Sequence, residues 1–318
     1  MFERIIAPEN IFAAWREFRQ GKMRKPDVLV FAERVEEHLL RLADDLATGK
    51  YIHGEYSRFV VHDPKRRAIA KAPVHDRVLH HAVHRVLAPL FDRSFIHDSY
   101  SSRVGKGTHA AGVRFRRFAG QLSHNHTRTV WVLQLDIRKF FDSVDHQVLL
   151  GLLRKKIRDD RVIVLLGIII QSFETKPGQG IPLGNLTSQL FSNVYLDPLD
   201  QFAKRTLGVK HYLRYADDIA ILSCDREFLE DCRDRIAAFL TRELKLVLHP
   251  DKVSLRPWHA GIDFLGYVHF PYYVVLRTIT KRRLLARTSP VNLASSLGVT
   301  HHIRGFGIER AMRDILNT

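Results

Sequence analysis

The sequence contains few cysteines and no long apolar stretch. Only two cysteines, Cys224 and Cys232, occur among 318 residues, and they lack the spacing of a zinc ribbon. Two thiols do not make a disulfide scaffold, so a reducing, cytoplasmic compartment is expected. The longest uncharged apolar run, 162–170, is much shorter than the ~20 residues that span a bilayer. Residues 1–4 carry an acid and no signal-like segment follows, which argues against secretion.

Acidic residues are scarce relative to basic ones. Lys and Arg total 50 against 34 Asp and Glu, which gives a formal net charge of +16. The excess lies in residues 61–130, at +9, and 251–318, at +6, whereas 131–250 is nearly balanced at +1. Basic segments grip phosphates, and carboxylates between them can hold metal ions. This distribution favours a nucleic-acid partner, with a solvated basic surface as the alternative.

Apolar periodicity predicts an α+β chain with an antiparallel sheet backed by helices. Helices are expected at 32–49, 74–90, 145–157, 186–206 and 226–244. Asp145 and Asp225 are the expected N-caps of the third and fifth, and Pro89 marks the end of the second.

Strands are expected where β-forming residues cluster. These segments are 57–63 and 130–137, with a hairpin over 211–223 and alternating strands and turns over 246–278. Lys65, Arg66 and Arg67 are expected in a turn after Asp63-Pro64.

Three aspartates stand out against this pattern. Asp136 ends an apolar strand, and Asp217 and Asp218 are adjacent at the tip of the predicted hairpin. Like charges this close repel unless a cation lies between them. Two Mg²⁺ ions would remove the repulsion, activate a 3′-hydroxyl and steady a leaving pyrophosphate. A solvated turn is the alternative reading of Asp217-Asp218 taken alone.

The surrounding residues resemble the sequence blocks of reverse transcriptases. YADD (215–218) resembles their YxDD box, and LDIRKFFDSVDH (135–146) resembles their first catalytic block. The acids Asp136 and Asp217 are 81 positions apart, which suits the palm of that family. Further blocks resemble the family in the same order, at 65–84, 98–110, 251–252 and 261–267.

The segment IPLGNLTSQ (181–189) carries the resemblance to a subfamily. It has Leu183-Gly184 where most reverse transcriptases have Gln-Gly, and Ser188-Gln189 where most have Ser-Pro. This pattern is similar to reverse transcriptases of diversity-generating retroelements, which copy a template-repeat RNA and misincorporate opposite its adenines. Residues 9–25 also resemble that group, whereas retrons and group II introns fit less well.

The resemblance implies a right-hand polymerase fold, with reverse transcriptase fingers and palm and a small, mainly helical thumb. Residues 1–55 are then an N-terminal extension, 56–273 the interleaved fingers and palm, and 274–318 the thumb. It also implies that Asp136, Asp217 and Asp218 are catalytic and ligate two Mg²⁺ ions, which Mn²⁺ can replace. The carbonyl of Ile137 is expected to assist in metal binding.

The resemblance also implies which residues bind the incoming dNTP. They are Lys65, Arg66, Arg67, Phe141, Leu183, Gly184 and Lys252. Cations suit the triphosphate, although a one-residue shift would exchange Arg66 and Arg67. Phe141 is expected to clash with a ribose 2′-hydroxyl, and one of Phe140 and Phe141 is expected to be core. Leu183 cannot donate a hydrogen bond as glutamine does, so we hypothesise that it loosens selection opposite adenine; an inert loop leucine is the alternative.

A further set is expected to contact template and primer: Arg103, Lys106, Gln189, Tyr215, Leu265, Gly266 and Tyr267. Simple core packing is the alternative for Tyr215 and for 265–267. The implied partners are template RNA, the RNA/DNA hybrid, dNTPs and a small basic accessory protein, the variability determinant. No membrane is expected among them. A zinc site at His80 and His84 is not expected, because His81 stands where the H-E-x-x-H motif requires Glu.

The expected function is RNA-directed DNA synthesis by a bacterial or phage-encoded enzyme. It would copy a template-repeat RNA into cDNA with errors opposite adenine, for mutagenic retrohoming. Two alternatives remain open. One is a defence-associated, retron-like or otherwise domesticated reverse transcriptase, and the other is a non-catalytic RNA-binding scaffold.

Overall fold

The computed structural model describes residues 1–62, 66–289, 293, 297, 298, 303 and 312. The chain divides into two compact units, each built from three segments. The first unit comprises Met1–His97, Ile137–Phe202 and Ala237–Leu248; the second comprises Asp98–Asp136, Ala203–Ile236 and His249–Thr318. In the described residues, no helix has the length and apolar character needed to span a membrane.

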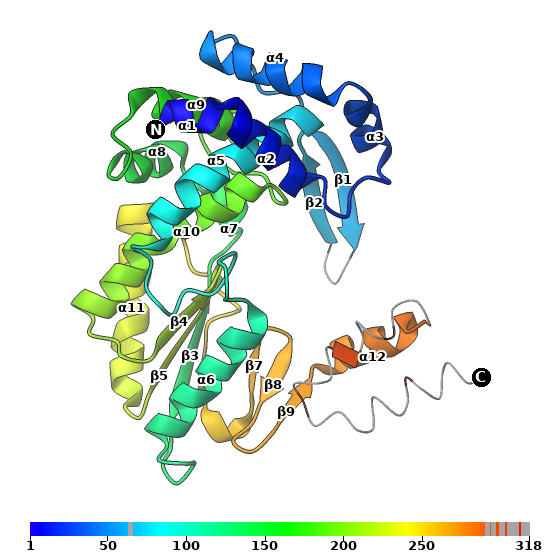
Figure 1. Cartoon of the computed structure of the whole chain (residues 1–318). Helices are drawn as coiled ribbons and strands as arrows, with labels where there is room; N and C mark the ends of the chain where they lie inside the picture. The colour runs from blue at the N-terminus through cyan, green and yellow to red at the C-terminus, as the bar shows by residue number, and fades with distance from the viewer. Residues whose placement is uncertain (63–65, 290–292, 294–296, 299–302, 304–311, 313–318) are drawn as a thin grey trace. The chain divides into compact units, whose positions relative to one another are not determined.

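The first unit is mainly helical (Figure 1). Its helices are α1 (Phe2–Ile6), α2 (Pro8–Phe18), α3 (Pro26–Glu33), α4 (Val35–Ala47), α5 (Val74–Asp92), α7 (Phe140–Ser143), α8 (His146–Arg154), α9 (Asp160–Gln171) and α10 (Leu186–Gln201). Helix α5 packs against both α2 and α10, and its residues Val78, Leu79 and Ala82 are fully buried. Burial of the apolar face of α5 therefore fixes the positions of the chain segments next to its two ends.

Two of the expected helices differ from the structure. The segment predicted as one helix over 32–49 is broken at Arg34, whose backbone angles (φ −127°, ψ 41°) separate α3 from α4. The helix expected to end at Pro89 runs on to Asp92. A proline inside a helix removes one hydrogen bond. Buried Leu87 and Phe91, on either side of it, hold the last turn in place.

One two-stranded antiparallel sheet belongs to the first unit. Strand β1 (Ser57–His62) pairs with β2 (Arg66–Lys71), so that His62 is opposite Arg66 and Val61 opposite Arg67. The expectation that Arg66 and Arg67 lie in a turn is therefore wrong: strand pairing extends to them. Lys65 lies outside the described residues.

A four-stranded antiparallel sheet forms the centre of the second unit. Its strands are β3 (Trp131–Asp136), β4 (Tyr212–Tyr215), β5 (Asp218–Ser223) and β6 (Ser254–Pro257), in the order β4-β5-β3-β6. The predicted buried strand and hairpin are confirmed as β3 and as β4–β5. The π-helical turn η1 (Phe202–Thr206) precedes β4, and helix α11 (Arg226–Leu244) follows β5. Its predicted N-cap is confirmed, because Asp225 Oδ1 accepts from the Phe228 N–H at 3.0 Å.

Helix α6 (Thr108–Leu122) covers this sheet and was not predicted (Figure 1). Phe115 and Phe118 on α6 share a buried cluster with Val132 on β3 and Ala220 on β5. The same cluster contains Phe264 of the next sheet. Because paired residues of neighbouring strands lie on one side of a sheet, this packing fixes which strand residues face α6.

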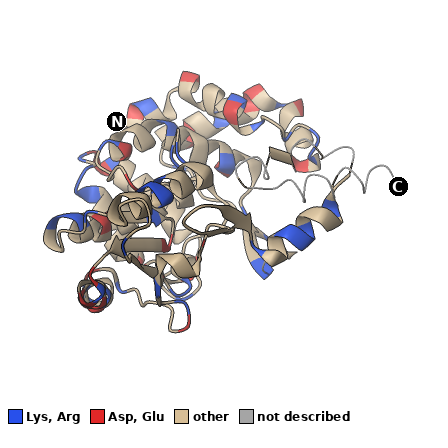
Figure 2. Ribbon diagram, turned by 90° about the horizontal axis from the view of Figure 1, so that it is seen from below, with Lys and Arg blue, Asp and Glu red and all other residues tan. Residues whose placement is uncertain are grey.

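A second sheet and a basic helix complete the described part of the second unit. Strands β7 (Ile262–Phe264), β8 (Tyr267–His269) and β9 (Val274–Leu276) form an antiparallel meander after the 3₁₀ turn η2 (Trp258–Ala260). Helix α12 (Thr278–Arg287) follows, and Figure 2 shows Lys and Arg along it without an acid. The rest of the expected helical thumb falls largely outside the described residues.

Candidate active site

Strand pairing brings two of the three predicted catalytic acids together. In the register of β3 and β5, Asp136 is directly opposite Asp218. Such cross-strand pairs have Cβ atoms about 5 Å apart. In the hairpin, Tyr215 pairs with Asp218, which leaves Ala216 and Asp217 as a two-residue loop. Asp217 therefore lies at the tip, one residue from the Asp136–Asp218 pair.

The hairpin loop has an unusual backbone. Ala216 has φ +52°, in the left-handed region that normally favours glycine. The Ala216 carbonyl accepts a hydrogen bond from Arg214 Nη1 at 3.1 Å. The cost of a positive φ at alanine is therefore opposed by a charge-assisted hydrogen bond from the adjoining strand.

Arg214 has no exposed surface, although it carries a charge. Its Nη2 donates to the Ser99 hydroxyl at 3.2 Å, and its backbone N–H donates to the Asp98 carbonyl at 2.9 Å. The buried Asp98 carboxylate in turn accepts from Arg114 Nε at 2.8 Å. These bonds link the β4–β5 hairpin to the chain before α6, and sequence analysis did not identify them. A charged residue within an apolar strand was the available signal.

The electrostatics of the pair are those of crowded carboxylates. Burial and the neighbouring charges of Asp217 and Asp136 together raise the pKa of Asp218 to about 6, against the opposing effects of Lys252 and Arg277. Although part of the Asp218 side chain faces solvent, its surroundings disfavour a second negative charge. Lys252 Nζ lies 2.7 Å from Asp136 Oδ1 and supplies a cation there.

Asp136 and Asp218 line a cavity of about 180 Å³ within the second unit. Gln134, on the same side of β3, donates through Nε2 to the Asp263 carbonyl at 2.8 Å. Arg277 forms an ion pair with the Asp263 carboxylate, and both line the cavity. The sequence analysis missed Asp263 and Arg277, because they become neighbours of the acids only when β7 and β9 pack against the main sheet.

The carboxylate oxygens of these aspartates suit a hard divalent cation. They are the ligands that Mg²⁺ prefers, and several of them must lie close together to bind one ion, as these do. In the described part of the chain, however, no three His, Cys, Asp or Glu side chains are already grouped as a metal cage. Ile137, expected to lend its carbonyl, follows Asp136 directly; its side chain is buried and its backbone bridges to Leu248 within the first unit.

Most of the expected dNTP residues lie in the first unit. Phe140 is buried, whereas Phe141 is only half-buried, so Phe140 is the core residue of the two. Leu183 is half-buried in the loop before α10. The next residue, Gly184, has φ +110°, and a Cβ placed there would approach Ile69 Cγ2 to 3.3 Å. The loop therefore lies against β2.

Arg66 and Arg67 point to opposite sides of β2, because successive strand residues alternate. Arg67 shares its side with Ile69, the residue that contacts the Gly184 loop. Arg66 shares the other side with Ala68 and Ala70. Only Arg67 therefore lies on the side of the sheet that faces the 183–184 loop.

The expected template and primer residues occur in both units. Arg103 donates through Nη1 to the Ser99 carbonyl at 3.0 Å, and Lys106 lies over the Tyr100 ring at 4.8 Å. Gln189 is exposed on α10 in the first unit. Tyr215 is half-buried and packs against the cluster beneath α6.

Leu265 and Gly266 form the two-residue loop between β7 and β8. Both have positive φ, at 53° and 90°, as the favoured tight hairpin turn requires. Tyr267 begins β8 and is half-buried. The loop carbonyl of Gly266 accepts from the Arg277 N–H at 3.3 Å.

Comparison with known proteins agrees with this geometry. Residues 62–269 match the family described as reverse transcriptase (RNA-dependent DNA polymerase), and they make up more than half of the chain. The chain belongs to the reverse transcriptase family. By family it is thus an enzyme, an RNA-directed DNA polymerase, and the match contains all three predicted catalytic acids.

The relatives of this reverse transcriptase include bacterial proteins. It is 26% identical over 275 residues to Protein YkfC of Escherichia coli, covering 74% of this chain and 71% of that one. It is also 26% identical over 303 residues to the group II intron-encoded protein LtrA of Lactococcus lactis, covering 73% and 49%. The chain thus spans about half the length of LtrA.

Solved structures support the predicted fold class. Telomerase of Candida tropicalis superposes with a TM-score of 0.56 at 13% identity, over 78% of this chain and 52% of that one. Telomerase of Candida albicans, in complex with a fragment of telomeric RNA, superposes with a TM-score of 0.55 at 10% identity, over 88% and 59%. The α+β right-hand polymerase fold expected from the sequence is confirmed.

Proposed function

We propose that this reverse transcriptase extends a DNA primer on an RNA template, with Asp136, Asp217 and Asp218 as the ligands of two Mg²⁺ ions. The observation that carries the proposal is the register that places Asp136 opposite Asp218, with Asp217 next to them at the hairpin tip. Bound there, Mg²⁺ or Mn²⁺ would supply a Lewis acid that lowers the pKa of a 3′-hydroxyl and neutralises pyrophosphate. The Ile137 carbonyl follows Asp136 in the chain and is proposed as a further oxygen ligand.

The chain's own residues account for the surroundings of that centre. The Lys252 ammonium, at 2.7 Å from Asp136, balances one carboxylate and is free to turn toward triphosphate oxygens on its flexible stem. Arg214 holds the hairpin backbone, so the two adjacent acids keep their directions. Arg277, paired with Asp263, adds positive charge to the cavity wall.

For the incoming dNTP, we assign the triphosphate to Arg67 rather than Arg66. Arg67 is on the side of β2 that faces the Leu183-Gly184 loop. Phe141 is assigned as the ring that excludes a ribose 2′-hydroxyl, because Phe140 is committed to the core. Lys65 is retained from the sequence as a second cation of the fingers.

The template and primer assignments rest on the sequence resemblance. Arg103, Lys106 and Gln189 are proposed to contact template, and Tyr215 with the 265–267 hairpin to support the primer. Residues 1–55 are proposed as the N-terminal extension, 56–273 as fingers and palm, and 274–318 as thumb.

A change of one carboxylate tests the catalytic proposal. Asp218→Asn keeps the side-chain shape but removes a charged ligand, so primer extension on an RNA template with Mg²⁺ should fall at least about 100-fold. Asp234→Asn, at an exposed aspartate of α11, is the matched control and should leave the rate unchanged. If Asp218→Asn extended primers at the wild-type rate, Asp218 would not be a metal ligand that the reaction needs. If the wild-type protein itself extended no primer, the non-catalytic scaffold would become the better interpretation.

The finer proposal is that this enzyme belongs to a diversity-generating retroelement. Its support is the pair Leu183-Gly184 and the pair Ser188-Gln189, which resemble that subfamily. On this proposal the template is a template-repeat RNA, a small basic accessory protein assists, and the enzyme works in a bacterial or phage-infected cytoplasm. The cDNA then carries errors opposite adenine into a target by mutagenic retrohoming.

The error spectrum tests the subtype. Products of primer extension on a mixed-sequence RNA, sequenced base by base, should show errors concentrated opposite adenine. Leu183→Gln restores a hydrogen-bond donor in the loop and should reduce those errors severalfold. Leu122→Gln, at a half-buried leucine of α6, makes the same chemical change outside the loop and should not.

A second candidate is favoured by the similarity to LtrA, a group II intron-encoded protein. An intron-type or otherwise domesticated reverse transcriptase would distribute its errors evenly over the template. It would also lack a neighbouring pair of template and variable repeats in its genome. An even spectrum that Leu183→Gln does not alter would therefore select this candidate over the retroelement.

A further inference from the structure

The hydroxyl of Tyr56 lies where three segments of the first unit meet. Tyr56 directly precedes strand β1. Its hydroxyl is 3.0 Å from the Ser172 Oγ, at the end of α9, and 3.3 Å from His53 Nε2. The Asn185 side chain also forms a hydrogen bond with this hydroxyl. One polar group therefore joins the start of β1 to the end of α9 and to the start of α10.

The ring of Tyr56 is fixed by aromatic neighbours. It stacks on the His53 ring with 4.9 Å between the centroids, and it meets the Phe173 ring edge-on at 5.6 Å. His53 in turn stacks on His80 of α5 at 5.4 Å. Such contacts restrict the direction of a ring. Burial and the charge of Asp76 raise the pKa of Tyr56 to about 12, so the hydroxyl keeps its proton at neutral pH.

A buried carboxylate fixes the segment that carries Tyr56. Asp76, in the first turn of α5, has no exposed surface. Its Oδ2 accepts from the Gly54 N–H at 3.0 Å, and its Oδ1 accepts from the Tyr51 hydroxyl at 2.7 Å. A Cβ at Gly54 would approach Pro73 Cγ to 2.8 Å, so the chain passes α5 at a distance that only glycine allows. Tyr56 is therefore presented from a segment that is bonded to α5 two residues earlier.

Asn185 bonds to Tyr56 and does not cap its own helix. It is the N-cap of α10, with the extended backbone of that position, but its side chain makes no capping hydrogen bond. Asparagine is favoured at N-caps because its side-chain oxygen can accept from the first turn of the helix. The side chain of Asn185 is only 4% exposed. It therefore serves to connect the start of α10 to Tyr56.

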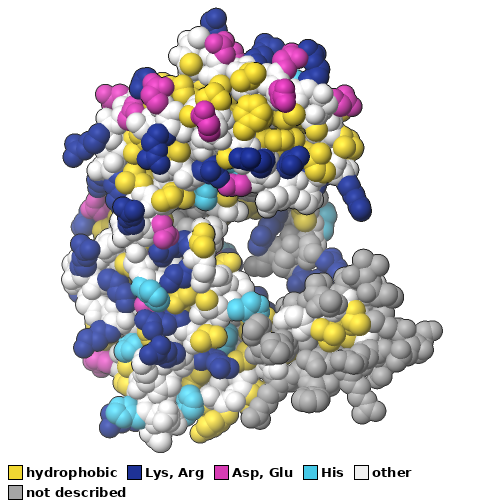
Figure 3. Space-filling model, in the orientation of Figure 1, with side chains coloured by type: hydrophobic (Ala, Val, Ile, Leu, Met, Phe, Trp, Pro, Cys, Tyr) yellow, Lys and Arg dark blue, Asp and Glu magenta, His cyan; other side chains and the backbone are white. Residues whose placement is uncertain are grey.

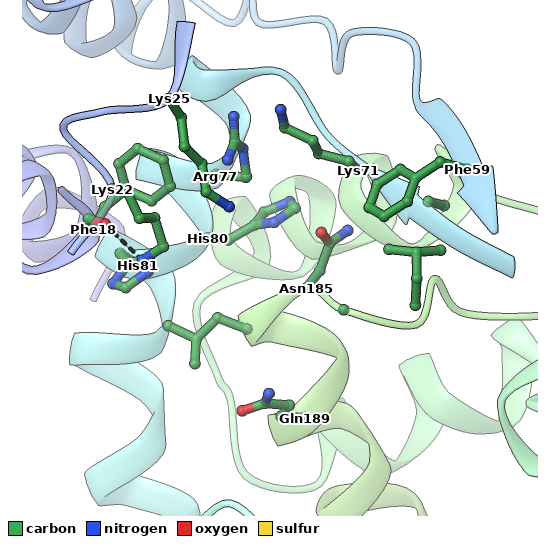
Figure 4. Close-up of a pocket in the computed structure, with 14 residues that line it drawn as sticks. Phe18, Lys22, Lys25, Phe59, Lys71, Arg77, His80, His81, Asn185 and Gln189 are labelled. Carbon is green, nitrogen blue, oxygen red and sulfur yellow. Dashed lines mark hydrogen bonds between the residues drawn. The ribbon is translucent and has the colours of Figure 1, made fainter. Parts of the chain in front are cut away.

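The connection reaches the segment proposed to bind the incoming dNTP. Asn185 directly follows Leu183 and Gly184. Gly184 and Asn185 line an open pocket of about 280 Å³ together with Ile69 of β2 (Figure 4). Because a Cβ at Gly184 would come within 3.3 Å of Ile69 Cγ2, the loop lies tightly against this strand. Its place there depends on where Tyr56 keeps Asn185.

We infer that Tyr56 is a positioning residue for nucleotide selection, which through Asn185 keeps the Leu183-Gly184 loop against β2, the strand that carries Arg67. The inference rests on the proposed function, in which this loop and Arg67 bind the incoming dNTP. It adds that nucleotide affinity and the choice of base depend on a hydroxyl that contacts neither the nucleotide nor the catalytic acids. Small displacements of a positioning group have large effects on a bound substrate.

Single-nucleotide incorporation measures this dependence. Tyr56→Phe removes the hydroxyl but keeps the ring between His53 and Phe173. The KM for the dNTP should rise about threefold to tenfold, as expected for the loss of one hydrogen bond. The kcat should change less than about twofold, because the bond acts on nucleotide binding and not on the acids. Errors opposite template adenine should rise at least about twofold, because the loop is less restrained.

Tyr51→Phe is the matched control. It also removes a buried tyrosine hydroxyl from this hydrogen-bond network, but Asp76 Oδ2 can still accept from the Gly54 N–H. Thermal unfolding should therefore show a loss of stability similar to that of Tyr56→Phe. The KM for the dNTP and the error spectrum should stay as in wild type.

Asn185→Ser tests whether Tyr56 acts through Asn185. Serine is also a favoured N-cap, so helix α10 should stay folded, but its side chain is too short to bond to Tyr56. The KM for the dNTP should rise as it does in Tyr56→Phe. The double variant should have a KM no higher than either single variant, because both changes remove the same bond.

Hydrogen exchange measures the loop without catalysis. In a peptide that covers residues 181–186, amide exchange should be about threefold to tenfold faster in Tyr56→Phe and in Asn185→Ser than in wild type. Tyr51→Phe should exchange in this peptide at the wild-type rate.

Three results would overturn the inference. A wild-type KM and wild-type exchange in Tyr56→Phe would show that the hydroxyl does not fix the loop. An equal rise in KM in Tyr51→Phe would assign the effect to general destabilisation, and additive effects in the double variant would show that Tyr56 does not act through Asn185. A wild-type protein that extends no primer would instead contradict the proposed function, and the exchange rates alone would then decide whether Tyr56 fixes the loop.

Discussion

At the residue scale, Arg214 is the side chain whose role the fold defines most sharply. It is fully buried, and its guanidinium reaches the Ala216 carbonyl and the Ser99 hydroxyl. Ala216 has a positive φ, so the hairpin backbone is held by Arg214 in a conformation that alanine does not favour by itself. The directions of Asp217 and Asp218 therefore depend on a residue that touches no substrate.

Replacing Arg214 tests this dependence. Arg214→Met leaves the two oxygen acceptors without their donor, so the free energy of unfolding in urea should fall by about 1–3 kcal/mol. The rate of primer extension should fall as well. Arg214→Lys, which keeps the charge and can reach one acceptor, should recover part of both losses. A methionine variant that matched wild type in stability and rate would show that the guanidinium bonds do not hold the loop.

At the element scale, helix α5 carries one buried and two half-buried histidines in its middle. His80, His81 and His84 all lie on it, and burial lowers the pKa of each, to about 3 for His80 and about 4 for His81. In the unfolded chain these rings titrate near 6.5. Between the two values the unfolded state binds more protons, so the folded state loses stability as the pH falls.

The expected result is a free energy of unfolding that is constant above about pH 7 and falls below about 6.5, by up to about 1.4 kcal/mol per pH unit for each such histidine. Urea unfolding between pH 8 and pH 5 measures the slope. His81→Gln should make the slope shallower, whereas His62→Gln, at an exposed histidine of β1, should not. Stability independent of pH over this range would contradict the neutral state of these rings in the folded protein.

At the scale of the whole molecule, the net charge of +16 favours binding to a nucleic acid. Lys and Arg are spread over the face shown in Figure 3, and α12 adds four more without an acid. A protein that neutralises phosphates releases counterions, so affinity for RNA should drop about 10³-fold or more between 50 and 200 mM salt if some six phosphates are contacted. Filter binding of an RNA/DNA hybrid over this range of salt concentration measures how steeply the affinity falls. A flat response would contradict electrostatic binding.

Local patterns in the sequence account for much of the second unit. The apolar run at 130–137 predicts strand β3, and the acid at its end emerges where the strand leaves the core. The two β-forming runs on either side of YADD predict the hairpin without the usual Asn-Gly. The N-caps Asp145 and Asp225 follow from side-chain chemistry within three residues, and both are confirmed.

Other features failed to follow from local pattern, each for a physical reason. Pro89 does not end α5, because buried residues on both sides maintain the last turn. Arg66 and Arg67 read as turn residues, but pairing with β1, a neighbour in space, places them in a strand. Gly107 precedes helix α6 and Gly112 lies within it, and both glycines disfavour a helix. Burial of Phe115 and Phe118 outweighs this preference.

The sequence by itself identified the family, the three candidate catalytic acids and the basic character of the protein. Each of these can be recognised in short stretches of adjacent residues or in the composition. Only the tertiary structure decided that Asp136 faces Asp218, that Arg67 rather than Arg66 shares the side of the 183–184 loop, and that Arg214 supports the hairpin. These relations join segments tens of residues apart, and they arise from strand register and helix packing, which the burial of apolar surface selects over the whole chain.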